Sequence, residues 1–134
     1  MDTDTAKLVE RAIRADGRYP PAAYEFLHYG LEFTTRMVHD LDAGEGPRHV
    51  SGQQLCEGLR ALALERWGSL APAVLSSWNI RRTRDFGEMV FLLIELGLMG
   101  KQESDHIEDF DNVYSFRQAF GHCEIPLDKF DEPD

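Results

Sequence analysis

His49 and Ser51 are the first pair of side chains in this sequence that could do chemistry, as a base and a nucleophile. A serine nucleophile needs a base within hydrogen-bond reach and a third group that orients the base. A separation of two residues does not supply that geometry, and the chain has no G-x-S-x-G segment. Gln54 lies three residues after Ser51, at the start of an apolar helical repeat, and this is the spacing of a capping box. We therefore predict that Ser51 caps a helix, and we predict no catalytic residue in the chain.

The segment "ESDHIEDFDN" could bind a divalent cation, because carboxylates and an imidazole are gathered within ten residues. The loop of an EF-hand, however, needs ligands at alternating positions, a central glycine and a glutamate at its twelfth position. This segment lacks the glycine and the spacing. We predict a solvated acidic hairpin loop, with a metal site as the alternative. Its candidate residues are Asp105, His106, Glu108, Asp109 and Asp111.

The two cysteines do not have the spacing of a zinc site. Structural zinc takes four ligands, usually in paired C-x-x-C or H-x₃-H spacings, whereas Cys56 stands alone and Cys123 has only His122 beside it. Two cysteines are also too few for a disulfide framework. We expect reduced thiols in a cytoplasmic protein, with Cys56 acting as a small buried apolar residue, and we expect no metal or other cofactor.

The segment "RRTR" is the one basic cluster, formed by Arg81, Arg82 and Arg84. It lies at the start of a predicted helix, where backbone N–H groups attract anions and arginines add bidentate donors. The functional interpretation is a contact with an anion or a partner. The alternative is pairing with the acidic loop of the same chain, which we favour because the acidic excess would otherwise be unopposed.

The elements that position these residues are helices. Gly30 lies in the middle of the second predicted helix, where glycine costs about 1 kcal/mol relative to alanine, and it indicates a close packing contact. Asn79 follows the fourth helix at a position suited to a left-handed residue, and Thr83 is predicted to cap the fifth. The periodicity and its breaks place the helices at residues 4–16, 21–40, 52–67, 70–78 and 84–96.

The end of the chain is predicted to differ from this helical part. Residues 98–102 and 112–116 could form two short strands around the acidic loop. Three helices followed by a hairpin is the outline of a winged helix, an architecture that carries no function by itself. The predicted fold is therefore mainly α, a five-helix single domain over residues 1–120 whose C-terminal part resembles a winged helix with a short β-hairpin. Residues 121–134 are predicted to form an acidic, extended tail.

Charge is unevenly distributed along the chain. Residues 1–100 carry 14 acidic and 11 basic side chains, and residues 101–134 carry 10 acidic and 3 basic ones. The last quarter thus accounts for −7 of a formal net charge of −10. Because such a surface repels phosphates and anionic lipids, we expect no binding to duplex DNA or to a membrane. No apolar run approaches the roughly 18 residues expected of a membrane span.

Four stretches of the chain together resemble an uncharacterised family of short bacterial proteins, known only as conserved hypothetical proteins. They are "AYEFLHYGLEFT", "HVSGQQLCEGLRALALERWG", "DFGEMVFLLIELGLMGKQESDHIEDF" and "YSFRQAF". The resemblance extends from Tyr19 to Phe120. It implies membership of that family and no particular activity.

The leading prediction for function is a non-catalytic cytoplasmic protein-interaction module with an unknown protein partner. A nucleic-acid-associated winged-helix-like protein is the alternative. In that outline residues 84–96 would be the recognition helix, but they are apolar and acidic and supply arginines only at their start. A metal-binding protein or an enzyme, based on the acidic loop, ranks third. The sequence leaves the oligomeric state open.

Overall fold

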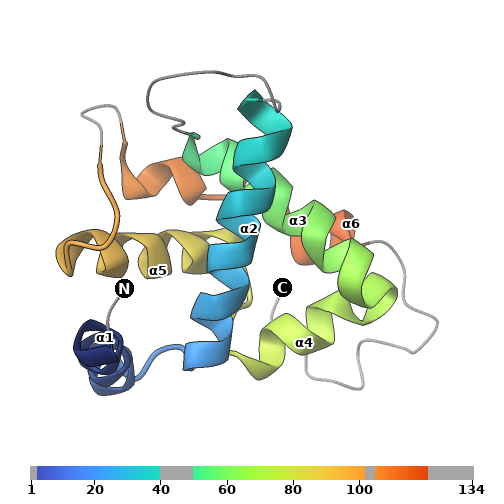
Figure 1. The fold of residues 1–134 in the computed structure, drawn as a ribbon. Helices are drawn as coiled ribbons and strands as arrows, with labels where there is room; N and C mark the ends of the chain where they lie inside the picture. The colour runs from blue at the N-terminus through green and yellow to red at the C-terminus, as the bar shows by residue number, and fades with distance from the viewer. Residues whose placement is uncertain (1–2, 40–49, 102–104, 121–134) are drawn as a thin grey trace.

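The computed structural model describes residues 3–39, 50–101 and 105–120. Helices make up 76% of these residues, and no strand occurs among them (Figure 1). No helix formed by the described residues is both long enough and apolar enough to cross a membrane. The elements are α1 (Thr3–Asp16), α2 (Pro21–His39), α3 (Gly52–Trp67), η1 (Gly68–Leu70), α4 (Ala71–Ser77), α5 (Thr83–Glu95), η2 (Ile107–Phe110) and α6 (Phe116–Ala119), where η marks a short 3-10 helix.

The mainly helical prediction is confirmed, and the predicted β-hairpin is wrong for the described residues. Gly97 has a φ of 79° and closes α5, and the backbone N–H of Leu98 donates to the carbonyl of Leu93 at 2.9 Å. That N–H therefore satisfies the end of a helix and is not available to a strand ladder. The second predicted strand contains the start of a helix, because the side chain of Ser115 caps α6. The predicted tail at residues 121–134 lies outside the described residues.

The closest packing between two helices is that of α2 on α3, and glycines permit it. A Cβ built on Gly30 of α2 would overlap Leu59 Cδ2 of α3. A Cβ built on Gly58 of α3 would overlap the hydroxyl of Thr34 on α2. That hydroxyl is fully engaged in the contact, since it donates to the carbonyl of Gly30 at 2.7 Å. The close contact predicted from Gly30 is confirmed, and Gly58 is its counterpart on the facing helix.

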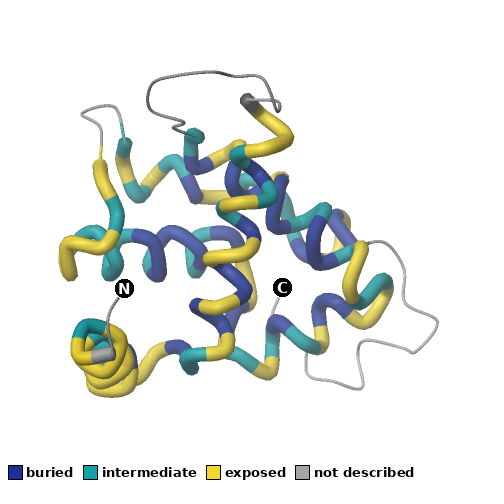
Figure 2. Tube along the Cα trace, viewed as in Figure 1, coloured by how far each residue is buried: buried dark blue, intermediate teal, exposed yellow. Residues whose placement is uncertain are grey.

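The buried residues lie along the parts of these helices that face the interior (Figure 2). The turn from α4 to α5 adds Ile80, which is fully buried. Asn79 precedes it with a φ of 67°, so the predicted left-handed closure of α4 is confirmed. The largest fully buried residues are Phe26, Leu27, Leu59, Leu75, Ile80, Phe86 and Met89.

The start of α3 has the predicted capping box. Ser51 Oγ accepts from the backbone N–H of Gln54 at 3.0 Å, and Gln54 Oε1 accepts from the backbone N–H of Ser51 at 2.8 Å. The corresponding prediction for α5 is wrong, because Thr83 is buried inside the helix and Arg82 occupies the cap position. The carboxylate of Asp85 accepts from the backbone N–H groups there instead.

We predict that Gly58→Ala destabilises the protein by about 1–2 kcal/mol. Overpacking a filled interior costs typically about 1–3 kcal/mol, while alanine regains up to about 1 kcal/mol through its helix propensity. Thr34 cannot move aside without giving up its hydrogen bond to Gly30. Equilibrium unfolding in urea measures the change.

Gly100→Ala is the control for this substitution, because a Cβ at Gly100 would meet no atom within 4 Å. We expect its free energy of unfolding to stay close to that of the wild type. Equal stability of the Gly58→Ala and wild-type proteins would contradict the close approach of α2 and α3.

Candidate functional site

The ring of Phe110 fixes the acidic segment against two helices. A Cβ on Gly87 of α5 would lie 2.8 Å from Phe110 Cγ, and a Cβ on Gly52 of α3 would lie 2.9 Å from Phe110 Cε1. Thr83 joins the same contact, because its hydroxyl donates to the carbonyl of Phe110 at 2.6 Å and accepts from the backbone N–H of Val113 at 3.2 Å. Within the segment predicted as a solvated loop, Ile107–Phe110 form a short helix, η2, whose last residue is buried.

This anchoring forms a groove of about 1100 Å³ beside the N-terminus of α5. One wall is the turn before α5 together with its first two turns, and the other is the segment from η2 into α6. The polar side chains that line it are Asn79, Arg81, Arg82, Thr83, Arg84, Asp85, Glu88, Asp111, Asn112, Ser115 and Gln118.

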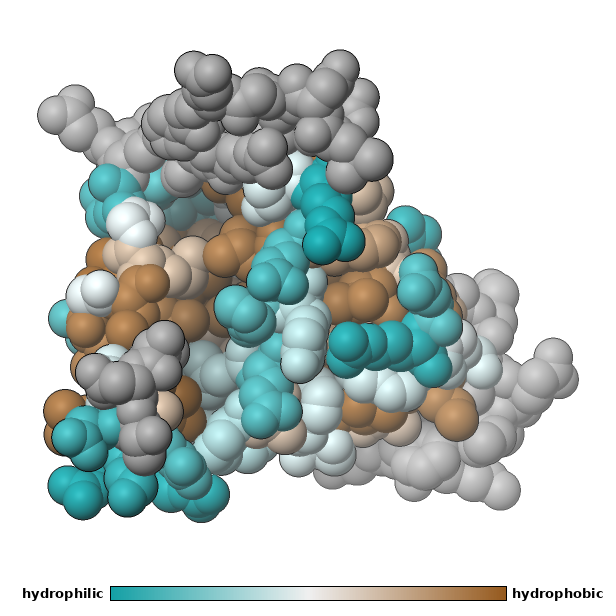
Figure 3. All heavy atoms as spheres, in the orientation of Figure 1, coloured by the Kyte–Doolittle hydropathy of each residue, from teal (hydrophilic) through white to brown (hydrophobic). Residues whose placement is uncertain are grey.

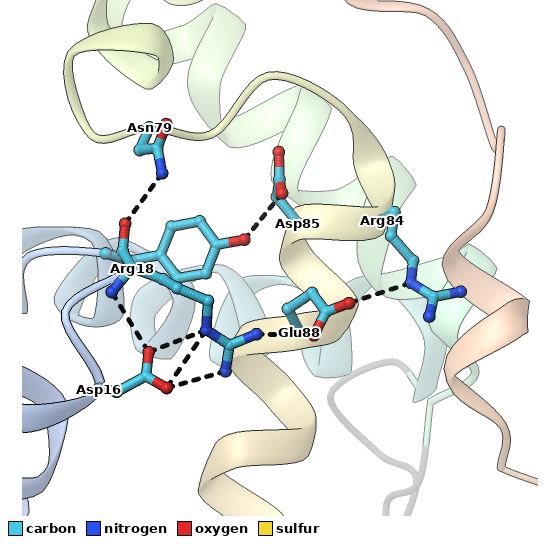
Figure 4. A network of polar contacts seen from close by, with 7 residues as sticks. Asp16, Arg18, Asn79, Arg84, Asp85 and Glu88 are labelled. Atoms are coloured by element: carbon cyan, nitrogen blue, oxygen red, sulfur yellow. Dashed lines mark hydrogen bonds and ion pairs between the residues drawn. The ribbon is translucent and has the colours of Figure 1, made fainter.

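Arg84 is engaged in ion pairs across the groove. Its Nη1 lies 3.0 Å from Asp111 Oδ1, and its Nε lies 3.2 Å from Glu88 Oε2. Glu88 is shared with Arg18, whose Nη1 lies 2.7 Å from Glu88 Oε1 and whose Nε lies 3.0 Å from Asp16 Oδ2 (Figure 4). Alternating charges thus run from the end of α1 across α5 to η2. Of the three predicted arginines, Arg84 is the one brought to the acidic segment.

Arg81 and Arg82 have a different environment. The guanidinium of Arg81 donates to Ser76 Oγ at 3.1 Å and lies 3.5 Å from Asn79 Oδ1. Arg82 is exposed, and neither guanidinium forms an ion pair with a carboxylate among the described residues. The nearest acid in sequence, Asp85, accepts from the backbone N–H groups of Arg81 at 2.7 Å and Arg82 at 3.1 Å. Asp85 therefore holds the main chain of the two arginines and not their guanidiniums.

The described side chains in the rest of the acidic segment are not arranged as ligands of a metal ion. Asp109 Oδ2 accepts from the backbone N–H of His106 at 3.1 Å, which caps η2. Together with Asp105, these two residues line a second cavity of about 150 Å³ whose other walls are largely apolar, while Glu108 is exposed. Within residues 3–39, 50–101 and 105–120, no three His, Cys, Asp or Glu side chains are grouped so that they could hold a metal ion.

The buried titratable groups are held in their protonated forms. Burial raises the pKa of the Cys56 thiol to about 12, and the side chain is fully buried, as predicted. Burial also raises the pKa of Tyr114, whose hydroxyl donates to the carbonyl of Cys56 at 2.6 Å. Burial and the hydrogen bond to Asp85 raise the pKa of Tyr19. None of these groups is a nucleophile at neutral pH. His49, His122 and Cys123 lie outside the described residues.

Sequence reasoning missed several residues on which the site depends, notably Asp85, Glu88 and Phe110. Two signals were present in the sequence. Gly52 and Gly87 lie within helices, where glycine indicates a close approach by another group. Asp85 lies three residues after Arg82, a spacing suited to an acid that accepts from the N-cap backbone. The ion pair of Arg84 with Asp111 has no comparable local signal, because it joins residues 27 positions apart.

No family model, no curated protein and no solved structure matches this chain.

We predict opposite effects for removing two neighbouring tyrosine hydroxyls. The hydroxyl of Tyr19 donates to Asp85 Oδ1 at 2.7 Å, whereas the buried hydroxyl of Tyr24 has no hydrogen-bond partner among the described residues. Tyr19→Phe should lower the free energy of unfolding by about 1.5 kcal/mol, since hydrogen bonds to charged groups contribute about 1.5–3 kcal/mol. Tyr24→Phe should leave it unchanged or raise it by up to about 1 kcal/mol, because an unsatisfied buried group is removed.

The two substitutions are controls for each other, because each deletes one hydroxyl from rings that pack edge to face with centroids 6.5 Å apart. Urea unfolding of both variants gives the comparison. A loss of more than about 1 kcal/mol in Tyr24→Phe would show that its hydroxyl has a partner.

We predict that acid weakens the fold through Asp16 and Glu88. The hydrogen bond from Arg18 lowers the pKa of Asp16 below its ordinary 3.8. Burial disfavours ionisation of Glu88, but hydrogen bonds from Arg84 and Arg18 outweigh burial and leave its pKa below 4.5. Both folded-state values are lower than the unfolded ones, so the contribution to stability is present above those ordinary values and is lost as the pH falls through and below them.

The measurement is the urea unfolding free energy of the wild type and of Glu88→Gln from about pH 7 to about pH 3. We expect the variant to be less stable at neutral pH and the difference to shrink in acid. Glu65→Gln removes the same charge at an exposed position and is the matched control. A difference for Glu88→Gln that is independent of pH would refute the role of its ion pairs.

Proposed function

We propose that this protein is a non-catalytic protein-interaction module whose contact surface is the groove beside α5. The observation that carries the proposal is the contrast between the acids and the bases of this groove. Asp85, Glu88 and Asp111 all accept from groups of the chain itself. Arg81 and Arg82 have no such carboxylate among the described residues, and a partner can supply it.

The state of the other polar groups in the groove supports binding more than catalysis. Thr83 uses its hydroxyl twice, towards Phe110 and Val113. Ser115 accepts at its Oγ from the backbone N–H of Gln118 at 3.1 Å. General acid–base and nucleophilic catalysis both need a group that is free to exchange a proton at the reacting atom. The hydroxyls of Thr83 and Ser115 instead hold the surrounding backbone in place, as does the carboxylate of Asp85, while Glu88 and Asp111 pair with arginines.

A second surface feature also favours contacts with another protein. The C-terminal half of α5 and the turn after it carry apolar side chains that are partly or largely exposed, and Figure 3 shows an apolar area on one face of the molecule. Contiguous apolar areas on protein surfaces commonly mark interaction sites. The residues are Phe91, Leu92, Leu93, Ile94, Leu96 and Leu98.

Association with nucleic acid is the less favoured function. The wing that would accompany a recognition helix has no counterpart among the described residues. In α5 itself, Phe86, Met89 and Val90 are buried in the core, so only the arginines at its start support this alternative. Membership of the uncharacterised bacterial family and a cytoplasmic location are part of the proposal and add no activity to it.

Site-specific photo-crosslinking in extracts of the source organism tests this proposal. We expect a photoreactive amino acid at position 118, where Gln118 is exposed and lines the groove, to form an adduct with a defined protein. Gln53 is the matched control, because it is an exposed glutamine on α3 that does not line the groove. Adducts at neither position, or equally at both, would contradict a partner in the groove.

A further inference from the structure

We infer that the groove binds a short acidic segment of the partner protein, with carboxylates of that segment pairing with Arg81 and Arg82. This inference rests on the proposed function and adds the chemistry of the ligand. It follows from two guanidiniums that have no carboxylate partner among the described residues, from the backbone that presents them and from the total charge of the protein.

The charged side chains that line the groove are equal in number but differ in their partners. Its lining contains three arginines and three acids. Arg84 uses Glu88 and Asp111, and Asp85 is occupied by backbone N–H groups and by the hydroxyl of Tyr19. The acids are therefore engaged, while two guanidiniums remain without a carboxylate among the described residues. The ligand that this arrangement fits is an anion.

The backbone of the two arginines is held in place by hydrogen bonds. Asp85 fixes the backbone N–H groups of Arg81 and Arg82, and Arg82 has an extended backbone with φ −159° and ψ 167°. The guanidinium of Arg81 is oriented by Ser76 Oγ. A backbone that is already ordered lowers the entropy that binding must overcome. The fixed fork of a guanidinium favours planar carboxylates, which can accept two parallel hydrogen bonds.

The net charge of the protein favours a ligand with few negative charges. The formal net charge of the protein is −10, and its long-range repulsion grows with the charge of an approaching anion. Duplex DNA carries one negative charge per about 1.7 Å of its axis. A peptide with two carboxylates meets far less repulsion and still provides one partner for each of Arg81 and Arg82. The observations therefore favour a weakly charged acidic peptide over a polyanion.

Two side-chain amides on the walls of the groove can bind a peptide backbone. Asn112 and Gln118 are exposed, and they lie on the wall that faces the arginines. Their side-chain amides both donate and accept hydrogen bonds, as does the backbone of a peptide. They suit an extended peptide backbone lying between the arginine wall and the wall formed by η2 and α6.

Fluorescence anisotropy of the full chain with defined probes tests the inference. The probe is a short labelled peptide with two glutamates, and the control peptide has glutamine at both positions. We expect binding of the glutamate peptide at about 0.15 M salt and at least roughly tenfold weaker binding of the glutamine peptide. The double variant Arg81→Ala/Arg82→Ala should lose roughly tenfold or more in affinity for the glutamate peptide.

The matched control is Arg11→Ala/Arg36→Ala, which removes the same charge at exposed positions outside the groove. It should bind the glutamate peptide like the wild type. Equal losses in both double variants would show a general charge effect and would overturn the site. Inorganic phosphate competing as well as the glutamate peptide would overturn a peptide ligand, because a bare anion would then suffice.

A labelled DNA duplex provides the remaining comparison, and we expect no measurable binding to it at about 0.15 M salt. Duplex binding tighter than peptide binding and lost in Arg81→Ala/Arg82→Ala would overturn the inference in favour of the nucleic-acid function. If position 118 crosslinks to a partner but the glutamate peptide does not bind, the inference fails and the proposed function stands.

Discussion

The arrangement of this molecule depends on two helical surfaces that have no side chain at the place where Phe110 meets them. Gly87 and Gly52 expose bare backbone on α5 and α3, and the aromatic ring lies against both. An aromatic side chain brings a large apolar area into such a contact. Because the ring is buried, Ile107–Phe110 form a short helix against α3 and α5 and not the solvated loop that the composition predicts. The groove exists because this contact holds η2 and α6 opposite the start of α5.

Polar contacts around the ring determine where the chain goes next. Thr83 binds the carbonyl of Phe110 and the N–H of Val113 with a single hydroxyl, so the backbone turns at a buried and fully satisfied point. Arg84 then meets Asp111 at the exposed edge of the groove. Exposed ion pairs contribute little to stability, whereas unsatisfied buried polar groups are costly. The buried hydroxyl and the ring therefore do more than the visible ion pair to hold the two walls together.

The sequence predicts the helices well because the relevant signals are local. Ser51 and Gln54 predict the start of α3, Asn79 predicts the end of α4, and Gly30 predicts a close contact in α2. Residues 107–110 are predicted as part of a loop, because a 3-10 helix of four residues has too few positions to show a period. The acidic residues on both sides of Phe110 also hide its role, which is to pack against α3 and α5.

The candidate site shows the same division between local and distant information. The basic cluster is visible in the sequence, and so is its position at the start of a helix. Which arginine is neutralised cannot be predicted from the cluster, since the answer depends on Asp111, a residue brought near by a contact elsewhere. The sequence therefore leaves both an anion site and an internal ion pair open, and it favours the ion pair only through the acidic excess of the whole chain. In the structure Arg84 forms the internal ion pairs, whereas Arg81 and Arg82 are exposed and form none with the described residues.

Asp85 is the residue that makes this division possible. A carboxylate three residues after Arg82 would ordinarily be its nearest counter-charge, yet it accepts from two backbone N–H groups and from the hydroxyl of Tyr19. One acid thereby fixes the start of α5, connects it to the segment before α2 and leaves two neighbouring cations without its charge. Arg84, the third arginine of the cluster, is by contrast paired with two carboxylates. The side chains of Arg81 and Arg82 form no ion pair with a carboxylate in the part of the chain that the structure describes, whereas Asp85 accepts from the backbone N–H groups of both, so the arrangement fixes the main chain from which the two guanidiniums extend.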